Sequence, residues 1–381
     1  MYKCSNEFHE AVANGNPQMA LLIFKDAVFT NRDINVSDGV EFNDYFNMEE
    51  DIAIGQATSN EIRFGLFNDA RLLNDYEFGD FLATLGVQIL TDQYQQYGSV
   101  MMNTNHAQWI GSDSMPFVRR NGSMPVQPSF AVKSMLGYDD KVWVFSGTGL
   151  YAVYDDITGQ NITSQYPMND FMRNKSKEWD EKGMFYNKDA RKLMIYSAGT
   201  KYIYEFVPLG WFTAERPNAP DVIQINMDCF DYMQKFDDDM PDADTLGFSY
   251  PITIGGLLQK LCDYVGVGLA TRNFINSGAT ITSKPKDFDS ATMRDVIKWI
   301  AEAGAGNARF NRDGELMIDW IRETTQVLTP TDYETFDPYW YKTKQITKLY
   351  NRGSDGSYEK TKGSGDEAYL IQDNPLLRGV S

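Results

Sequence analysis

Few residues in this sequence stand in an arrangement typical of catalysis. The chain contains two histidines, His9 and His106, and neither has a serine or cysteine in a recognisable nucleophile motif. A Ser-His-Asp or Cys-His mechanism therefore has little support. Two isolated histidines also lack the spacing of a zinc site, so surface or hydrogen-bonded histidines are the favoured interpretation. Carboxylate pairs for glycoside hydrolysis are defined in space, and 53 acidic residues make any pair in the sequence uninformative.

The acidic run at 237–244, with the sequence DDDMPDAD, offers potential ligands for Ca²⁺. It lacks the mid-loop glycine and the distal glutamate of an EF-hand loop. Because runs of like charge usually repel one another and stay solvated, we favour a linker over a calcium site. The glycines at 147–149 and 304–306 belong to turns and match no nucleotide-binding motif. The sequence thus predicts no catalytic, cofactor-binding or metal-binding residues.

Aromatic residues make up 14% of the chain, a high share that suits β-rich structure and interfaces. Trp211, Trp320 and the Tyr-Trp-Tyr segment at 339–341 could form a platform for glycans. In a β-rich oligomer, such side chains more often fill a core or a subunit interface. We therefore favour a structural role for them.

Length and charge narrow the class of protein. A chain of 381 residues is long enough for about two to four small domains with cores of their own. The formal net charge of −18 argues against a nucleic-acid-binding surface. Neither a long apolar run nor a basic region followed by an apolar segment is present, so we predict no membrane span and no secretory signal. Cys229 and Cys262 lie in apolar patterns and are expected to be small buried side chains.

The clearest structural pattern lies between residues 251 and 320. Apolar side chains at 254–265 fall on one helical stripe, which Thr253 can cap and Gly266 can end in the left-handed conformation. A second helix is predicted to follow Thr292, with Asp295 placed for a capping box. That helix should end at Gly304.

A hairpin is predicted after the second helix. Residues 308–320 form two alternating runs around Asp313-Gly314, a strong turn signal. Two one-sided helices and a hairpin must bury their apolar faces against one another. The stretch therefore predicts a compact α/β module.

The same stretch resembles a known family. The segments PITI at 251–254, TMRDVI at 292–297 and ARFNRDGEL at 308–316 resemble the hub of long-tailed bacteriophage tails. The similarity is to the N-terminal, trimer-forming part of tail-associated lysin or prophage tail-endopeptidase proteins, which are related to the baseplate hubs of contractile tails. IGQATSNEIRFGLFN at 54–68 and Asp-Asn-Pro at 373–375 resemble further parts of these hubs.

The resemblance implies an α+β, β-rich fold with two tube-forming, β-barrel-like domains, a small inserted β domain and the two-helix plus hairpin α/β module. The first tube domain would be 1–118, completed by 206–236, with the inserted β domain at 119–205. The module would occupy 237–321, and 322–381 would contain part of the second tube domain and the C-terminal segment.

Finer expectations accompany this division. We predict irregular loops at 93–132 and a flexible loop at 353–365. The predicted hairpins are at 141–154 and 192–206, and a helix is expected near 168–179. The strands expected outside the hairpins are 19–24, 28–34, 40–46, 222–229 and 344–351.

The implied function is that of a structural virion protein and not an enzyme. It would form a homotrimeric tail hub that adapts the sixfold tube to a threefold tip and encloses the exit channel for DNA and the tape-measure protein. The implied partners are the distal tail protein, the tail tube protein, the tape-measure protein and a tail fibre or receptor-binding protein. The protein would be made in the bacterial cytoplasm and reside in the virion tail.

Two other classes remain open. One is a tail-borne cell-wall hydrolase or peptidase, which zymography on peptidoglycan would reveal. The other is a host-glycan-binding tail adhesin, whose retention on host cell wall would be lost on substitution of Trp179 or Trp340.

Overall fold

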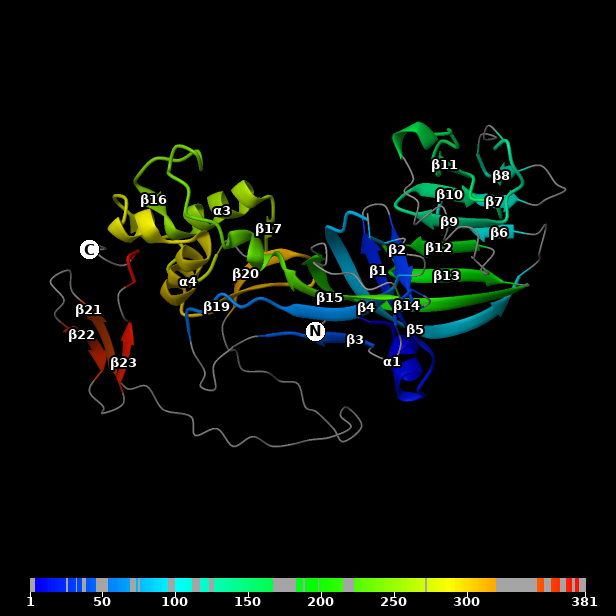
Figure 1. The fold of residues 1–381 in the computed structure, drawn as a ribbon. Coiled ribbons are helices and arrows are strands. Elements are labelled where there is room, and N and C mark those ends of the chain that lie inside the picture. Colours follow the sequence, from blue (N-terminus) through cyan, green and yellow to red (C-terminus); the bar gives the residue numbers. More distant parts are fainter. Residues whose placement is uncertain are drawn as a thin grey trace. The chain divides into compact units, whose positions relative to one another are not determined.

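The computed structural model divides the chain into two compact units (Figure 1). Unit 1 comprises Met1–Phe42 and Glu61–Cys229, and unit 2 comprises Asn43–Asn60 and Phe230–Ser381. The residues that the structure describes are 4–24, 27–31, 33–35, 39–45, 54–68, 73–74, 76–94, 100–111, 117–122, 127–166, 183–187, 189–197, 199–214, 223–270, 273–319, 348–352, 358–363, 368–371 and 374–376.

Unit 1 is built on one large curled β-sheet, and the protein is β-rich as predicted (Figure 1). Its longest strands, β5 (Asp80–Gln93) and β14 (Thr200–Thr213), pair antiparallel over their full length. The other strands of this sheet are β1 (Gln18–Phe24), β2 (Val28–Thr30), β3 (Val40–Asn43), β4 (Glu61–Phe67), β9 (Ser134–Tyr138), β10 (Lys141–Phe145), β11 (Tyr151–Asp155), β12 (Gly183–Asn187), β13 (Lys192–Ser197) and β15 (Gln224–Asp231). The described strands follow the order β11-β10-β9-β12-β13-β14-β15-β4-β3, while β5 joins β14 to β1 and β1 pairs with β2.

Strand β1 has a hydrophobic core on each of its two faces. Leu22 and Phe24 pack in a cluster with Phe81 and Phe212. The intervening residues of β1 pack in a second cluster that includes Phe206. A strand covered on both faces needs a continuous apolar sequence. This explains the apolar run MALLIF, which forms residues 19–24 of β1.

Both predicted hairpins of unit 1 are confirmed. β10 and β11 pair antiparallel across the turn that contains Gly149, and β13 and β14 pair across the turn at Gly199. Strands β9–β13, from the predicted insert at 119–205, hydrogen-bond into the same sheet as β14. The helix expected near 168–179 lies outside the described residues.

The prediction of irregular loops at 93–132 was wrong in part. β6 (Val100–Asn103), β7 (Gln108–Gly111) and β8 (Val118–Arg120) form an antiparallel sheet of three short strands. Their inward side chains, such as Met102 and Trp109, join a core with residues of β10 and β11. Strands this short give too few alternating residues for a pattern to stand out between polar turns.

A helix near the N-terminus was not predicted. In α1 (Asn6–Ala13) the Ser5 Oγ accepts a hydrogen bond from the Phe8 N–H at 3.1 Å and so caps the helix. The buried Glu205 carboxylate of β14 accepts hydrogen bonds from Ser5 N at 2.9 Å and Ser5 Oγ at 2.5 Å. These contacts fix the start of the helix to unit 1.

Unit 2 contains the predicted helix and hairpin module. The helices α3 (Ile254–Val265) and α4 (Met293–Ala303) have the expected bounds, and the hairpin consists of β19 (Asn307–Phe310) and β20 (Glu315–Asp319). Thr253 caps α3, and Gly266 ends it with a φ of 75°. The predicted capping box of Thr292 and Asp295 is present at α4. β17 (Gly268–Leu269) pairs parallel with β20, giving the order β17-β20-β19.

Smaller elements complete the described part of unit 2. β22 (Tyr358–Gly363) lies within the predicted flexible loop at 353–365, so that prediction was wrong in part. The other described elements of unit 2 are the 3₁₀ helices η3 (Tyr232–Phe236) and η4 (Lys286–Ser290) and the strands β16 (Ile252–Thr253), β18 (Thr280–Ile281), β21 (Lys348–Arg352) and β23 (Ala368–Ile371). The 3₁₀ helix η2 (Thr163–Gln165) belongs to unit 1.

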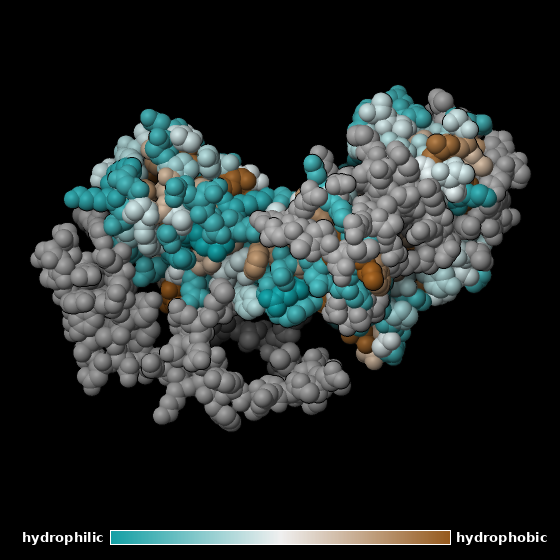
Figure 2. All heavy atoms as spheres, viewed as in Figure 1, coloured by the Kyte–Doolittle hydropathy of each residue, from teal (hydrophilic) through white to brown (hydrophobic). Residues whose placement is uncertain are grey.

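The described surface is mainly hydrophilic in the view of Figure 2, and hydrophobic residues form small separate spots on it. Cys229 and Cys262 are buried, as predicted. None of the helices that the structure describes has the length and apolar character needed to span a bilayer.

Candidate functional site

Three segments that lie far apart in the sequence, 55–58, 251–319 and 374–376, meet in the core of unit 2. Residues 55–58 lie beside β19: Gly55 N donates to Gly306 O at 2.9 Å, Ala308 N donates to Gln56 O at 2.7 Å, and Thr58 N donates to Ala308 O at 3.0 Å. Ala57 and Ala308 form a parallel bridge. The segment therefore extends the small sheet of the module by a short stretch of extended chain. The segment lies about 200 residues before the module, and nothing in the sequence predicted that it would pair with β19.

Gly55 permits a close approach to α4. Its φ is +84°, and a Cβ at this position would lie 2.8 Å from the Cβ of Glu302. A side chain would thus be strained by the backbone conformation and by the contact. The glycine in the IGQ segment is explained by packing.

The Asp-Asn-Pro stretch also enters this core. Asn374 Nδ2 donates to Trp299 O at 2.7 Å and to Glu302 Oε2 at 3.0 Å, while Asn374 Oδ1 accepts from Leu376 N at 3.1 Å. Leu376 is 1% exposed and belongs to the same hydrophobic cluster as α3 and α4. Burial raises the pKa of the Glu302 carboxyl above its ordinary value, and the Asn374 hydrogen bond opposes this. Residues 374–376 therefore anchor the C-terminal part of the chain to α4.

Asp231 joins two distant parts of unit 2. Its carboxylate is 2% exposed and accepts hydrogen bonds from Ser59 Oγ at 2.9 Å, Asn60 N at 2.9 Å and Met233 N at 3.0 Å. The last of these caps η3. Burial raises the pKa of Asp231 to about 6, although the hydrogen bonds favour the ionised form. No pattern in the sequence pointed to the bonds between Asp231 and residues 59–60.

The acidic run at 237–244 lies against the start of α4. The Asp237 carboxylate forms an ion pair with Arg294 Nε at 2.8 Å. The backbone also contributes: Met293 N donates a hydrogen bond to Asp238 O, and Asp239 forms a β-bridge with Thr292. The Asp242 carboxylate accepts from Thr245 N at 2.7 Å, and this bond helps to lower the Asp242 pKa. Several of these carboxylates and carbonyls thus serve local structure.

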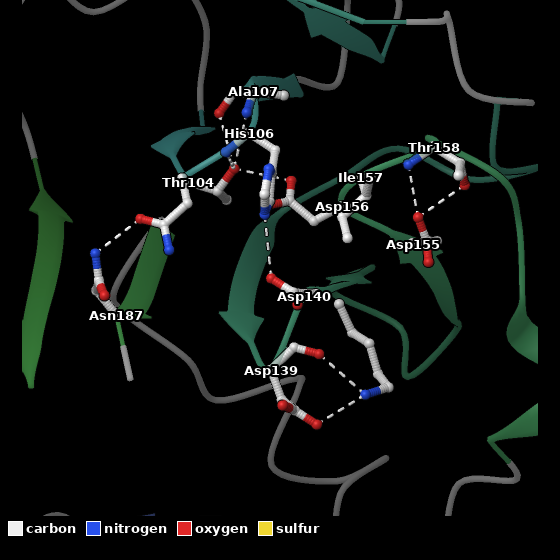
Figure 3. A network of polar contacts seen from close by, with 12 residues as sticks. Thr104, His106, Ala107, Asp139, Asp140, Asp155, Asp156, Ile157, Thr158 and Asn187 are labelled. Carbon is white, nitrogen blue, oxygen red and sulfur yellow. Dashed lines mark hydrogen bonds and ion pairs between the residues drawn. The ribbon is translucent and has the colours of Figure 1, made fainter. Parts of the chain in front are cut away.

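A second polar cluster lies in unit 1, around the buried side chain of Asp156 (Figure 3). Asp156 Oδ1 accepts from Trp109 Nε1 at 2.6 Å and from Thr104 Oγ1 at 2.8 Å. Arg119, which is 3% exposed, donates to the carbonyls of Asp156 and Ile157. A Cβ at position 122 would lie 1.2 Å from Arg119 Nη1, so Gly122 leaves space for the guanidinium.

A polar depression of about 430 Å³ lies over the β6–β7 turn of unit 1. Its lining includes His106, Gln108 and Arg120, together with Asn103 and Asn105. The exposed His106 ring lies 3.2 Å from Asp140 (Figure 3). Apart from Ala107, the described residues of the lining carry amide, hydroxyl or basic groups, and none of them is a carboxylate.

The structure does not join the two histidines in a catalytic arrangement within its described residues. His9 is exposed on α1, and the His106 ring contacts Asp140. Trp211 is half-buried in β14, whereas Trp179, Trp320 and 339–341 lie outside the described residues. Across the described ranges, no cluster of three or more His, Cys, Asp or Glu side chains is arranged to hold a metal ion.

The Asp156 cluster was missed at the level of sequence. Asp156 lies 37 to 52 positions from Thr104, Trp109 and Arg119, and none of these residues belongs to a motif. Only the alternation of Val118-Arg119-Arg120 along a strand would have placed one arginine inside and one outside. No protein-family model matches the chain, and comparisons with curated proteins and with solved structures found no match.

Proposed function

We propose that this chain is a structural virion protein, a homotrimeric hub at the distal end of a bacteriophage or prophage tail. In this role it adapts the sixfold tube to a threefold tip and encloses the channel through which DNA and the tape-measure protein leave. It acts by assembly and not by catalysis.

The observation that carries this proposal is the common core of residues 55–58, 251–319 and 374–376. These residues belong to the segments 54–68, 251–320 and 373–375, whose sequences and order along the chain resemble tail hubs. Unrelated coincidences would have no reason to meet in one hydrophobic core. Their packing together therefore supports a single hub-like module.

One end of the large sheet of unit 1 offers a surface for subunit contact. β3 ends the order of the described strands, and the neighbouring strand β4 carries Phe67, which is 40% exposed. Ile223, just before β15, is 65% exposed. A terminal strand with exposed apolar side chains nearby favours association, and a closed ring removes the edges that would otherwise recruit further chains. At the other end, the backbone of β11 is already occupied by bonds to residues 161–163.

The partners of such a hub are the tail tube protein, the distal tail protein and the tape-measure protein, with a tail fibre or receptor-binding protein at the tip. Its place is the virion tail. The net charge of −18 favours an acidic channel wall, along which DNA moves without binding.

Measurement of mass in solution tests the proposal. A trimer has three times the chain mass of 43.4 kDa, about 130 kDa, and this mass is expected at micromolar concentration. Phe67→Glu should shift the mass toward the monomer, whereas Leu150→Glu, at an exposed site in the β10–β11 turn, should leave it unchanged. A monomer at every concentration would contradict the proposal.

The rival enzymatic function is tested separately. Zymography with the full chain on peptidoglycan should give no cleared zone if the protein acts by assembly alone. Clearing, abolished by heat denaturation, would favour the hydrolase or peptidase.

A further inference from the structure

We propose that the polar depression over the β6–β7 turn in unit 1 binds a neutral carbohydrate. This inference does not depend on the trimer, since none of the residues that carry it belongs to the proposed subunit contact at β3, Phe67 and Ile223. It assigns a recognition role to a surface that the assembly function does not use.

A row of three polar side chains crosses the depression. Asn103, Gln108 and Arg120 are cross-strand partners on β6, β7 and β8 and face outward, because the alternate residues Trp109 and Arg119 are buried. Gln108 Nε2 donates to Asn103 Oδ1 at 3.1 Å, and Arg120 Nη1 lies 3.5 Å from Gln108 Oε1. The row presents donors and acceptors side by side at the spacing of adjacent strands.

This combination matches the chemistry of a sugar. Vicinal hydroxyl groups each donate and accept, and an amide side chain does both. The depression of about 430 Å³ falls within the size of small-molecule sites, which span roughly 300 to 1,000 Å³. Among the described lining residues Arg120 is the one with a guanidinium, and the Asp140 carboxylate lies 3.2 Å from the His106 ring, so an anion would meet a weak field (Figure 3). A neutral polyhydroxylated ligand is therefore favoured.

A buried network holds the turn that forms one wall of the depression. Thr104 Oγ1 accepts from Ala107 N at 3.0 Å and donates to Asp156 Oδ1 at 2.8 Å (Figure 3). Asn187 Nδ2 donates to Asn105 Oδ1 at 2.7 Å and fixes the tip of the turn. The wall is thus ordered before any ligand arrives, which reduces the entropy cost of binding.

The network beneath the turn is costly to bury. Asp156 and Arg119 are 1% and 3% exposed, and Arg119 Nε and Nη1 find no hydrogen-bond partner in the described structure. Replacement of buried charges by apolar groups is often neutral or stabilising, so such groups are weak evidence for a purely stabilising role. Their effect here is to fix the position of Thr104 and of the residues that follow it.

The test uses the full chain and a panel of glucose, galactose, rhamnose and N-acetylglucosamine, each at millimolar concentration, with saturation-transfer NMR as the readout. At least one sugar should give a signal with the wild-type protein. Gln108→Ala should reduce that signal at least about tenfold, because the central amide of the row is lost. Gln93→Ala, which removes an exposed glutamine at the end of β5, should not reduce it.

The inference is overturned if no sugar gives a signal with wild type, or if Gln108→Ala binds as well as wild type. A further measurement adds inorganic phosphate and asks whether it competes with the sugar for the depression. If phosphate displaces the sugar or binds in its place, the site recognises anions and the inference is wrong. Circular dichroism of both variants shows whether each is folded, and Asn103→Ala replaces Gln108→Ala if the latter is not.

Discussion

Asn374 donates its side-chain amide to the backbone carbonyl of Trp299 at 2.7 Å, across 75 residues of sequence. This bond gives a carbonyl of α4 a second donor, and Leu376, two residues further on, lies in the hydrophobic core. Asn374→Ala should therefore destabilise unit 2 by about 1 to 3 kcal/mol, because a buried carbonyl loses its extra partner and the turn at 374–376 loses its own bond. Urea unfolding followed by the fluorescence of the tryptophans measures this change.

Asn273→Ala is the matched control for that experiment. Asn273 is an exposed asparagine of unit 2, so its replacement should change the free energy of unfolding by less than about 0.5 kcal/mol. Equal effects of the two substitutions would show that residues 374–376 do not anchor the C-terminal part of the chain.

Replacement of Gly55 tests the close contact with α4. Gly55→Ala combines a φ of +84° with a contact of 2.8 Å to the Glu302 Cβ, so it should destabilise unit 2 by about 2 to 4 kcal/mol. Gly247→Ala shares a positive φ of +66° but meets only Lys260 Nζ at 3.8 Å, and should cost about 1 kcal/mol. The difference between the two variants in thermal unfolding isolates the steric part. A smaller effect at Gly55 than at Gly247 would contradict the packing described for this segment.

The helix and hairpin module could be predicted from sequence because its signals are local. Thr292 and Asp295 stand three residues apart, and the capping box that they form needs nothing from the rest of the chain. Gly266 and Asp313-Gly314 likewise mark a helix end and a turn through their own backbone preferences. The bounds of α3 and α4 follow from these residues.

The contacts that unite the distant segments could not be predicted in this way. The bonds of Asp231 to Ser59 and Asn60 join residues more than 170 positions apart, and no periodicity in either segment points to the other. No periodicity near Thr104 and Trp109 points to Asp156 either. These residues make contact only because the fold brings β6, β7 and β11 together. α1 was missed because it has only eight residues and buries only Ala11, so it shows no apolar stripe. Tertiary contacts, here with Glu205, supply what the local sequence lacks.

The capping box of α4 gives a prediction of local stability. Thr292→Ala removes the acceptor for the Asp295 N–H, which lies 3.1 Å from Thr292 Oγ1, and should cost about 1 kcal/mol. Thr292→Ser keeps the hydroxyl and should recover most of this loss. Chemical denaturation of the two variants measures the difference. Equal stability of the alanine and serine variants would show that the cap contributes little.

Asp231 should make the stability of unit 2 fall as pH rises through the acid range. Burial raises the pKa of its carboxyl from 3.8 to about 6 in the folded protein. Between these values the folded state binds a proton that the unfolded chain has released, so the free energy of unfolding decreases with rising pH and levels off above about pH 6. Asp231→Asn removes this titration. The free energy of unfolding of wild type minus that of the variant should therefore fall by about 2 to 3 kcal/mol from pH 4 to pH 7, since one pKa unit corresponds to about 1.4 kcal/mol. Urea unfolding at several pH values measures the difference, with Thr282→Ala, at an exposed position without a titrating group, as the control. A constant difference across this range would mean that the carboxylate is ionised in its buried site, held by the hydrogen bonds from Ser59, Asn60 and Met233.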